Sequence, residues 1–433
     1  MSLPAYAEYK KTGFIWVDLA PSHWPLNRLG DICSFEQGKA HEPFIDPDGE
    51  YICVNSRFVS TEGASRKFCL KNLTPVKMHD ILMVMSDLPN GRALAKAYFV
   101  QDDRPYAVNQ RVCRISAKSN ASAKFLFYLL NRHPDLMMCD DGVNQTHLSN
   151  SDYLKLKIYL PSLPEQTTIA RFLDHETAKI DSLIAEQQRL IELLKEKRQA
   201  VISHAVTKGL DPNAPMKDSG VAWLGDVPEH WEVMALKWKA RIKSGDGISP
   251  NDISHDLASE INIPVFGGNG IMGYTNKKNI ENKCIVIGRV GALCGNVHKI
   301  EDHVWVSDNA LVLDFKDDFF YINYLTFFLY SRNLNDLADK SAQPLITGGK
   351  VLNQMITCPS MTEQTQISKF IECETAKIDE LISHAHQGID LLKERRSALI
   401  SAAVTGKIDV RGWQPPATAA TTPQGQQQTL FDD

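Results

Sequence analysis

Four loop segments of this sequence gather residue types that hydrogen-bond to the edges of nucleic acid bases. They read SDLPNGRALAKAY (86–98), VNQR (108–111), GGNGIMGYTNKKN (267–279) and GRVGALCGN (288–296). Arg pairs with guanine, Asn and Gln pair with adenine, and Gly lets the backbone approach a phosphate. A Gln also recurs late in each half, in NQTHLS and AQPLIT. These segments predict a base-reading surface; ordinary solvated loops are the alternative for any single residue.

The candidate DNA-binding residues are of four kinds: amides, basic residues, one tyrosine and the two late glutamines. They are Asn90, Arg92, Lys96, Asn109, Gln110, Arg111, Gln145, Asn269, Tyr274, Asn276, Lys277, Lys278, Arg289, Asn296 and Gln343.

Motifs for covalent chemistry are missing. The sequence contains no N-P-P-[YF] motif of base methyltransferases, no H-E-x-x-H, and no CxxC pair among its nine cysteines. TGGKVL (347–352) fails the P-loop spacing, and GNGIMG (268–273) is followed by the turn-like YTNKKN rather than by a helix. We therefore predict no catalytic residue, no metal site and no cofactor in this chain.

Short apolar runs separated by turn clusters predict β-rich regions at 25–158 and 232–356. Candidate strands are Ile81–Met85, Val112–Ile115, Ile285–Gly288 and Ala310–Leu313, and candidate late helices are 124–132 and 322–332. The loops that carry the candidate residues lie between these elements, so a rigid sheet is expected to position them.

Two long helices are expected between and after these regions. No Pro or Gly occurs from Glu165 to Val206, and apolar residues recur at gaps of three, four and seven, as in a coiled-coil seam. The second stretch repeats the stripe, with Gly388 interrupting it. We expect the helices to pair antiparallel; the alternative is that each packs on its own globular region. The predicted seam residues are Leu173, Ile180, Leu183, Leu190, Leu194, Ile378, Leu381, Leu392 and Leu399.

The chain is a tandem duplication. ETAKID stands at 176–181 and again at 374–379, and TGFIWVDLAPSHW (12–24) matches SGVAWLGDVPEHW (219–231). The helical stretches are repeated while the β-rich regions have diverged. In the hexapeptide, Glu176, Lys179 and Asp181 are predicted to face either a partner or solvent. His23 and His230, each before a Trp, are predicted to serve packing.

Composition excludes little. The formal net charge is −5, so any DNA contact must come from local basic patches or from positive charge on partners. No apolar run is long enough to span a membrane, and the N-terminus lacks a signal-peptide core, so a cytoplasmic location is expected. The Pro/Gln/Thr-rich tail is expected to be disordered.

The sequence resembles the specificity subunit of type I restriction–modification systems. The matching stretches are LPSLPEQTTIARFLDHETAKID, LLKEKRQAVISHAVTKGLDPNAPMKDSGVAWLGDVPEHWEV and LLKERRSALISAAVTGKIDV. The resemblance implies two target recognition domains that each bind half of a split double-stranded DNA sequence. It also implies two modification subunits that use S-adenosylmethionine and restriction subunits that use ATP and Mg²⁺, all on other chains.

The expected fold is α/β (α+β): two globular target recognition domains separated by a pair of long antiparallel helices, in a pseudo-two-fold tandem repeat. The expected boundaries are 1–158 for the first recognition domain with an arm at 1–22, 159–211 for the first helix, 212–357 for linker and second domain, 358–410 for the second helix, and 411–433 for the tail. The rival functions are a scaffold or inhibitor that binds a restriction complex without reading sequence, and an enzyme of unknown type built from duplicated domains.

Overall fold

The structure is a computed structural model that describes residues 4–88, 93–140, 143–257, 261–316, 318–339 and 344–415. It divides into two compact units. The first unit comprises Met1–Ala185 and Ile389–Asp433, and the second comprises Glu186–Gly388. Each unit therefore holds one β-rich domain and parts of two long helices.

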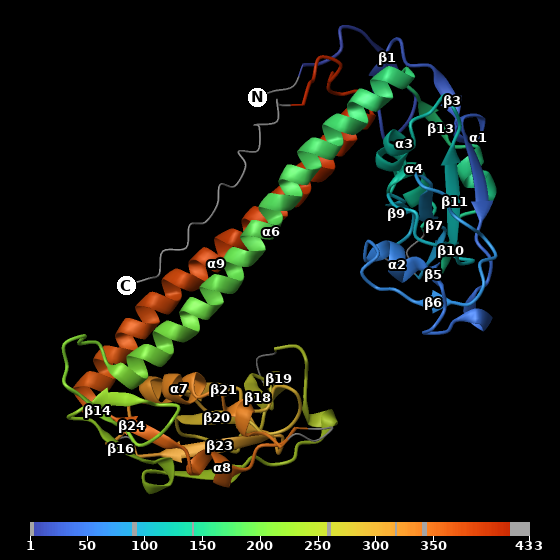
Figure 1. Ribbon diagram of the computed structural model, residues 1–433. Helices are drawn as coiled ribbons and strands as arrows, with labels where there is room; N and C mark the ends of the chain where they lie inside the picture. Colours follow the sequence, from blue (N-terminus) through green and yellow to red (C-terminus); the bar gives the residue numbers. More distant parts are fainter. Residues whose placement is uncertain are drawn as a thin grey trace, which may run out of the picture. The chain divides into compact units, whose positions relative to one another are not determined.

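The first unit is built on a four-stranded antiparallel sheet of order β4-β11-β7-β9. Its strands are β4 (Cys33–Gln37), β7 (Ile81–Val84), β9 (Ala97–Phe99) and β11 (Val112–Ala117). Strand β7, sequence ILMV, is buried along its whole length because both faces of the sheet are covered. Helices α3 (Ala123–Leu130) and α4 (Pro134–Met137) lie near strands β9, β7 and β11 (Figure 1).

Smaller elements complete the first unit. A three-stranded sheet of order β10-β5-β6 pairs β5 (Tyr51–Val54) parallel to β10 (Tyr106–Val108) and antiparallel to β6 (Phe68–Cys69). Two-stranded pairs join β1 (Tyr9–Lys11) to β2 (Leu19–Pro21), β3 (Leu26–Arg28) to β13 (Lys157–Tyr159), and β8 (Ser86–Asp87) to β12 (Thr146–His147). The short helices are α1 (Leu29–Ile32), α2 (Ser56–Ser60) and α5 (Asn150–Leu154).

The second unit repeats this topology despite its different sequence. Its four-stranded sheet has the order β17-β23-β20-β21, and its three-stranded sheet the order β19-β18-β22. These strands are β17 (Ala240–Ser244), β18 (Ile263–Gly267), β19 (Gly270–Thr275), β20 (Cys284–Gly288), β21 (Val297–Ile300), β22 (Trp305–Val306) and β23 (Ala310–Phe315). The remaining elements are β14 (Met216–Asp218), β15 (Asp226–Pro228), β16 (Glu232–Ala235), β24 (Met355–Cys358), α7 (Ile322–Ser331) and α8 (Gly348–Leu352). The four predicted strands and both predicted late helices are confirmed.

The long helices are α6 (Leu163–Lys208) and α9 (Met361–Val404), and each unit pairs a segment of one with a segment of the other. In the first unit, Ile169 to Leu173 of α6 share a core with Ala403 and Val404 of α9, while Asp181 bonds to Arg396. Contacts that move forward on α6 thus move backward on α9, so the segments are antiparallel. The segments of the second unit are antiparallel too. Ile202 to Val206 of α6 share a core with Ile367 and Ile371 of α9, while Arg198 of α6 bonds to Asp379 of α9.

The buried stripe of the helices differs from the predicted seam at three positions. Leu173, Ile180, Leu194 and Ile378 are buried, and Leu392 and Leu399 are partly buried. The prediction is wrong for Leu183, Leu190 and Leu381, which are 43–52% exposed. The stripe alternates steps of three and four residues, and the register that buries Thr177, Ile180 and Ile191 places these leucines one position off it.

Each long helix begins at a carboxylate that anchors the matched tryptophan. In the first unit, Trp24 Nε1 and the Tyr6 hydroxyl donate to Glu165 Oε1 at 3.1 and 2.7 Å, and His23 Nε2 lies 3.1 Å from Oε2. In the second, Trp231 Nε1 and His230 Nε2 lie 3.2 and 2.7 Å from Glu363 Oε1. The two histidines bond to a helix start and also pack as predicted, with the His23 ring centroid 5.6 Å from that of Tyr6 and the His230 ring centroid 6.4 Å from that of Trp231.

Gly388 lies inside α9, which runs through it, as expected for a glycine that weakens a helix without ending it. One further expectation needs correction. Within the segment 411–433, expected to be disordered, residues 411–415 are described and Trp413 packs against helix α6, with its ring centroid 5.6 Å from that of Phe172. Residues 416–433 lie outside the described residues.

Candidate nucleic-acid interface

In the first unit, three loops meet at one edge of the four-stranded sheet. They follow β4, follow β7 and precede β11. Gly38 N donates to Val112 O at 2.9 Å, and Met85 N donates to Arg111 O at 2.9 Å. The pairing of β8 with β12 brings the late glutamine to the same edge, where Gln145 Nε2 donates to Ser86 Oγ at 2.9 Å. We call this edge, formed by residues 37–39, 86–87, 109–111 and 145–147, the first reading edge.

Three predicted residues are exposed at the first reading edge: Gln110, Arg111 and Gln145. Their side chains are available to a ligand from a backbone that the sheet holds rigid. Amide and guanidinium groups in such positions suit adenine and guanine, respectively.

Two other predicted residues of this unit are used within the fold. Asn109 is 5% exposed, and its Nδ2 donates to Glu42 Oε1 at 2.8 Å while its Oδ1 accepts from Gln110 N at 2.7 Å. Lys96 Nζ donates to Ser60 O at 2.8 Å and lies 3.6 Å from Glu62. Burial and these bonds hold the Asn109 side chain inside the domain, so the structure does not place it among the exposed candidate groups. Asn90, Arg92 and Gln343 lie outside the described residues.

The second unit forms an equivalent edge at the end of β20. Arg289 N donates to Asn309 O at 3.0 Å, and its Nη1 donates to Ser244 Oγ at 3.1 Å. Asn296 Nδ2 donates to Asn269 Oδ1 at 3.0 Å. We call this edge, formed by residues 244–246, 268–270, 288–296 and 307–309, the second reading edge. It brings together the predicted residues Arg289, Asn269 and Asn296.

Glycines allow this edge to form. A Cβ on Gly288 would lie 2.0 Å from Gly268 O, and Gly270 has φ +105° at the tight turn that joins β18 to β19. The G-x-G-x-x-G pattern of this segment is thus a hairpin turn that passes over a neighbouring strand.

The other predicted residues of the second unit lie elsewhere on the hairpin. Tyr274 is four residues from the turn, which corresponds to about 14 Å along a strand. Lys277 Nζ bonds to Asp252 at 2.8 Å, Lys278 Nζ lies 3.1 Å from Glu281, and Asn276 is exposed between them and the strand. These four residues are not brought to the second reading edge.

Two residues that the sequence did not single out also lie at these edges, Lys39 at the first and Asn309 at the second. Lys39 directly follows Gly38, and a Cβ on that glycine would lie 2.2 Å from Asn109 O. Gly245 holds the same position in the second unit, where a Cβ would lie 2.3 Å from Ser307 O. The signal was present in the sequence as two glycines at matched repeat positions, QGK (37–39) and SGD (244–246).

Comparison with known proteins identifies the family. The model of the type I restriction modification DNA specificity domain matches residues 21–193 and again 228–389, which is most of the chain. The chain belongs to this family.

Similar proteins agree with this identification. The type I restriction enzyme MjaVIII specificity subunit of Methanocaldococcus jannaschii is 22% identical over 435 residues, covering 90% of this chain and 94% of that protein. A chain solved in work on complex assembly and conformational transition of the type I R-M system has a TM-score of 0.69 at 15% identity, covering 90% of this chain and 99% of its own. The HsdS subunit from Thermoanaerobacter tengcongensis has a TM-score of 0.51 at 16% identity, covering 92% and 100%.

The chain is therefore a DNA sequence-specificity subunit of a type I restriction–modification system, and these matches do not favour a scaffold that ignores sequence. They agree with the α/β (α+β) tandem repeat. No helix in the described part of the chain is long and apolar enough to cross a membrane. Among the described residues, no cluster of His, Cys, Asp and Glu is suited to a metal ion.

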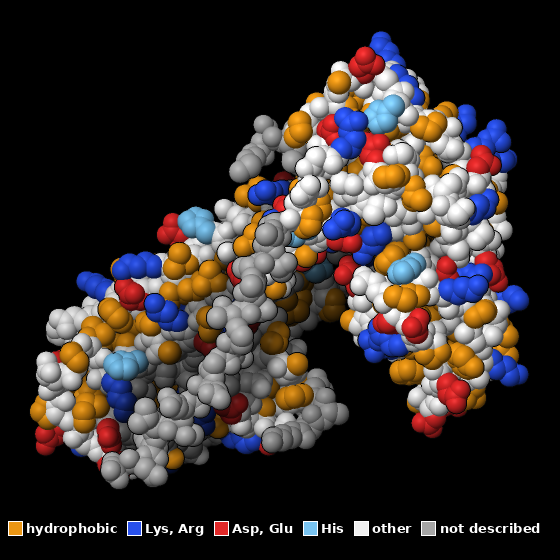
Figure 2. Space-filling view, turned by 45° about the horizontal axis from the view of Figure 1, so that its top comes forward, with side chains coloured by type: hydrophobic (Ala, Val, Ile, Leu, Met, Phe, Trp, Pro, Cys, Tyr) orange, Lys and Arg blue, Asp and Glu red, His pale blue; other side chains and the backbone are white. Residues whose placement is uncertain are grey.

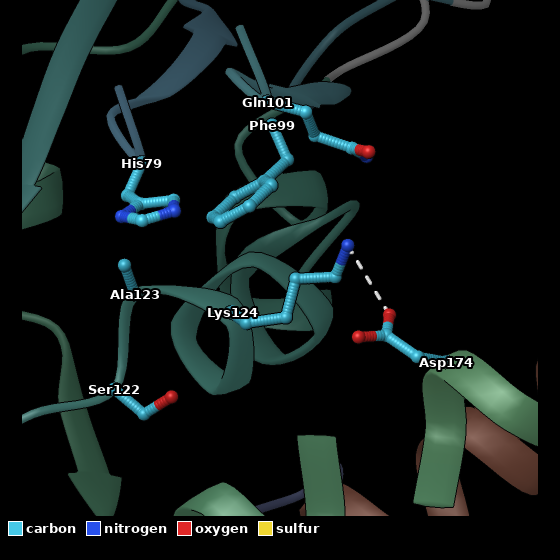
Figure 3. Close-up of a pocket in the computed structure, with 7 residues that line it drawn as sticks. All are labelled: His79, Phe99, Gln101, Ser122, Ala123, Lys124 and Asp174. Atoms are coloured by element: carbon cyan, nitrogen blue, oxygen red, sulfur yellow. Dashed lines mark ion pairs between the residues drawn. The ribbon is translucent and has the colours of Figure 1, made fainter. Parts of the chain in front are cut away.

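In this specificity subunit, each reading domain is fixed to its helix by matched contacts. Ser122 N, at the start of α3, donates to Gln166 Oε1 at 2.7 Å, and Tyr321 N, at the start of α7, donates to Gln364 Oε1 at 2.8 Å. Lys124 Nζ reaches Asp174 at 3.1 Å across a hollow of about 480 Å³ (Figure 3). Figure 3 also shows His79 and Phe99 lying together at the side of this hollow, with ring centroids 5.9 Å apart.

The surface charge of the specificity subunit is mixed. On the face shown in Figure 2, basic and acidic side chains alternate over the units instead of forming one large basic area. Several cations are paired, for example Arg104 with Asp102 at 2.6 Å, where the hydrogen bonds from Arg104 lower the pKa of the Asp102 carboxyl to about 2. The face shown thus carries little excess positive charge.

Proposed function

We propose that the two reading edges each recognise one half of a split DNA target. The supporting observation is that the two units share one backbone framework but carry different side chains at the edge. Both units have the same strand order and the same glycine-supported edge, but the first presents Gln110, Arg111 and Gln145, whereas the second presents Arg289, Asn269 and Asn296. Different side chains on equal supports would select different bases in each half-site.

We propose further that two modification subunits dock on the repeated helices. Part of the repeated sequence joins the two helices to each other, since Asp181 bonds to Arg396 and Asp379 bonds to Arg198. Other repeated residues are apolar and exposed: Leu183 and Leu381 are 46% and 52% exposed, and Leu193 and Leu391 are 48% and 65% exposed. Identical exposed apolar positions in two copies suit two copies of one partner.

The catalytic steps would then belong to these partners. S-adenosylmethionine would bind the modification subunits, and ATP and Mg²⁺ would bind the restriction subunits. This chain would supply target choice and assembly as a non-catalytic subunit of a cytoplasmic complex, and the modification subunits would also supply positive charge around the duplex.

An exchange of recognition domains tests the split target. Replacing residues 25–158 by the corresponding region of another specificity subunit should change one half of the methylated sequence and leave the other half intact. Methylome sequencing of cells that express the complete system gives the readout. A change in both halves, or in neither, would contradict the assignment of one half-site to each domain.

A single substitution tests the second reading edge. If Arg289 contacts a guanine, Arg289→Ala should weaken binding of the assembled complex to its target by about 1–3 kcal/mol and relax specificity at one position of one half-site. Lys277→Ala is the matched control, because that cation lies off the edge and bonds to Asp252. Equal effects of the two substitutions would remove Arg289 from the list of reading residues.

A further inference from the structure

The outer face of α6 is covered in the first repeat by the segment that follows α9. Trp413 packs on Phe172 with ring centroids 5.6 Å apart at 79°, and on His175 with centroids 5.6 Å apart. Phe172 is only 3% exposed. Thr168 and Arg171 line a small hollow beside the indole together with Gln414 and Pro415. An aromatic side chain thus closes this helix face.

Trp413 is held in place by the segment that precedes it. Asp409 N donates to Pro4 O at 2.7 Å, Val410 is 2% exposed within the core of the first unit, and Trp413 N donates to Val410 O at 2.9 Å. The carboxylate of Asp409 also bonds to Arg411, at 2.6 Å. The tryptophan therefore belongs to an anchored turn.

The equivalent face in the second repeat is exposed in the part of the chain that the structure describes. The repeat places Phe370 at the position of Phe172 and Cys373 at that of His175. Phe370 is 41% exposed and the Cys373 thiol is exposed. The position of Trp413 is taken by Pro215, after which the chain enters β14 and pairs with β15. Among the described residues, no aromatic ring packs on Phe370.

We propose that the α9 face around Phe370, with Gln366, Lys369 and Cys373, binds an aromatic side chain of a modification subunit. The first repeat shows what such a face accepts, because there an indole packs edge-on against the equivalent phenylalanine. It also shows that the chain itself occupies the first face. The two docking faces are therefore unequal: the first modification subunit binds at Phe370, and the second must displace Trp413. This inference rests on the proposed docking of modification subunits to the repeated helices.

Matched thiols provide the test. Cys373 is a native reporter of the open face, and His175→Cys places a thiol at the equivalent position of the covered face, both in a Cys139→Ser background that removes the other exposed cysteine. Alkylation by iodoacetamide is followed by mass spectrometry of each peptide as purified modification subunit is added to the full chain. We expect the first equivalent to protect Cys373 at least tenfold, and the second equivalent to be needed for the introduced thiol.

Variants at Trp413 and Phe370 separate the two faces. In Trp413→Ala, both thiols should become protected at the same concentration of modification subunit. In Trp413→Phe, the introduced thiol should still need the second equivalent. A chain that ends after Gly412 should behave as Trp413→Ala, which guards against a local folding defect in the point variant. Phe370→Ala should weaken the first binding step at least tenfold, whereas Leu257→Ala, which removes a leucine that is 66% exposed elsewhere in the second unit, should not.

The outcomes distinguish the inference from its basis. Two equal binding steps that ignore Trp413→Ala would overturn the unequal faces and leave modification-subunit docking intact. No binding to any variant would overturn the docking proposal itself. Protection of Cys373 by rising concentrations of this chain alone would assign the face to a second copy and overturn the choice of partner.

Discussion

At the residue scale, His133 is the clearest buried titratable group of the first unit. Its side chain is 1% exposed, its Nδ1 accepts a hydrogen bond from Asp135 N at 3.2 Å, and its ring packs edge-to-face on Trp16 at 4.5 Å. Burial lowers the pKa of His133 to about 4, because the protonated ring would lose its hydration without gaining a partner for its charge.

This lowered pKa predicts acid sensitivity of the first unit. The neutral imidazole is favoured in the fold, so the contribution to stability is complete above about pH 6.5, the unfolded value, and is lost as pH falls toward 4. The loss should be on the order of 3 kcal/mol. His133→Asn keeps an acceptor for Asp135 N. It should reduce the fall in melting temperature between pH 6.5 and pH 4. The exposed His147→Asn is the control, and parallel pH profiles for wild type and His133→Asn would refute the assignment.

Glu363 shows the opposite balance. Burial alone would raise the pKa of its carboxyl, but hydrogen bonds from His230, Trp231 and Ser360 outweigh burial and lower the pKa to about 2. The carboxylate stays charged at neutral pH, where it accepts from the N–H of Ser360 at 3.1 Å and ties Trp231 to the first turn of α9.

At the element scale, the long helices combine a buried stripe with repeated cross-helix ion pairs. Arg198 reaches Asp379 at 3.0 Å, and Arg396 reaches Asp181 at 2.9 Å. Both aspartates are about half exposed, so each pair is worth only about 0.5 kcal/mol, and its value lies more in fixing the register of the pair. This explains why the last residue of the repeated hexapeptide is an aspartate in both copies.

Gly388 offers an element-scale prediction. It lies inside α9, and a Cβ added there would meet no atom within 4 Å. Gly388→Ala should therefore raise the free energy of unfolding by about 1 kcal/mol, because alanine lowers the backbone entropy of the unfolded chain without a clash. Urea denaturation followed by circular dichroism measures this. Ala398→Gly, at an exposed position of the same helix, should cost a similar amount, and a loss of stability in Gly388→Ala would count against the prediction.

At the scale of the whole molecule, the segment that follows α9 takes the place that the linker after α6 takes in the other unit. In the second unit, a Cβ on Gly209 would lie 3.2 Å from the Trp231 ring. In the first unit, a Cβ on Gly406 would lie 3.1 Å from the Trp24 ring, and Tyr9 donates its hydroxyl to Gly406 O at 3.0 Å. The backbone at the C-terminal end of a long helix therefore packs against each matched tryptophan ring. One helix continues into the linker and the other into the C-terminal segment.

The proposed division of labour in the complex gives a prediction for the whole molecule. The purified chain should transfer no methyl group from S-adenosylmethionine to DNA. Both half-sites should be methylated once modification subunits are added. Incorporation of labelled methyl groups into target DNA measures this, with DNA lacking the target as the control. Methyl transfer by the chain alone would refute the non-catalytic role.

The sequence by itself determined the duplication, the long helices, the four strands and the family, because these depend on local periodicity and on repeated text. The candidate DNA-contacting residues could be predicted only as residue types on loops. Gln110 and Gln145 carry the same amide group as Asn109, yet they are exposed while Asn109 is buried against Glu42. Which side of a loop faces the core depends on partners far away in the sequence.

Only the tertiary structure decided the helix register and the coverage of the helix faces. Leu183 and Ile184 are neighbours in an apolar stripe, and the sequence cannot tell which of them faces the other helix. The packing answers this by burying Ile180 and Ile191 in steps of three and four, which leaves Leu183 exposed. In the same way, Phe172 and Phe370 are equal in sequence and differ in exposure because Trp413 covers only the first. The apolar periodicity is a property of the local sequence, whereas the burial of a side chain depends on which distant segment packs against it.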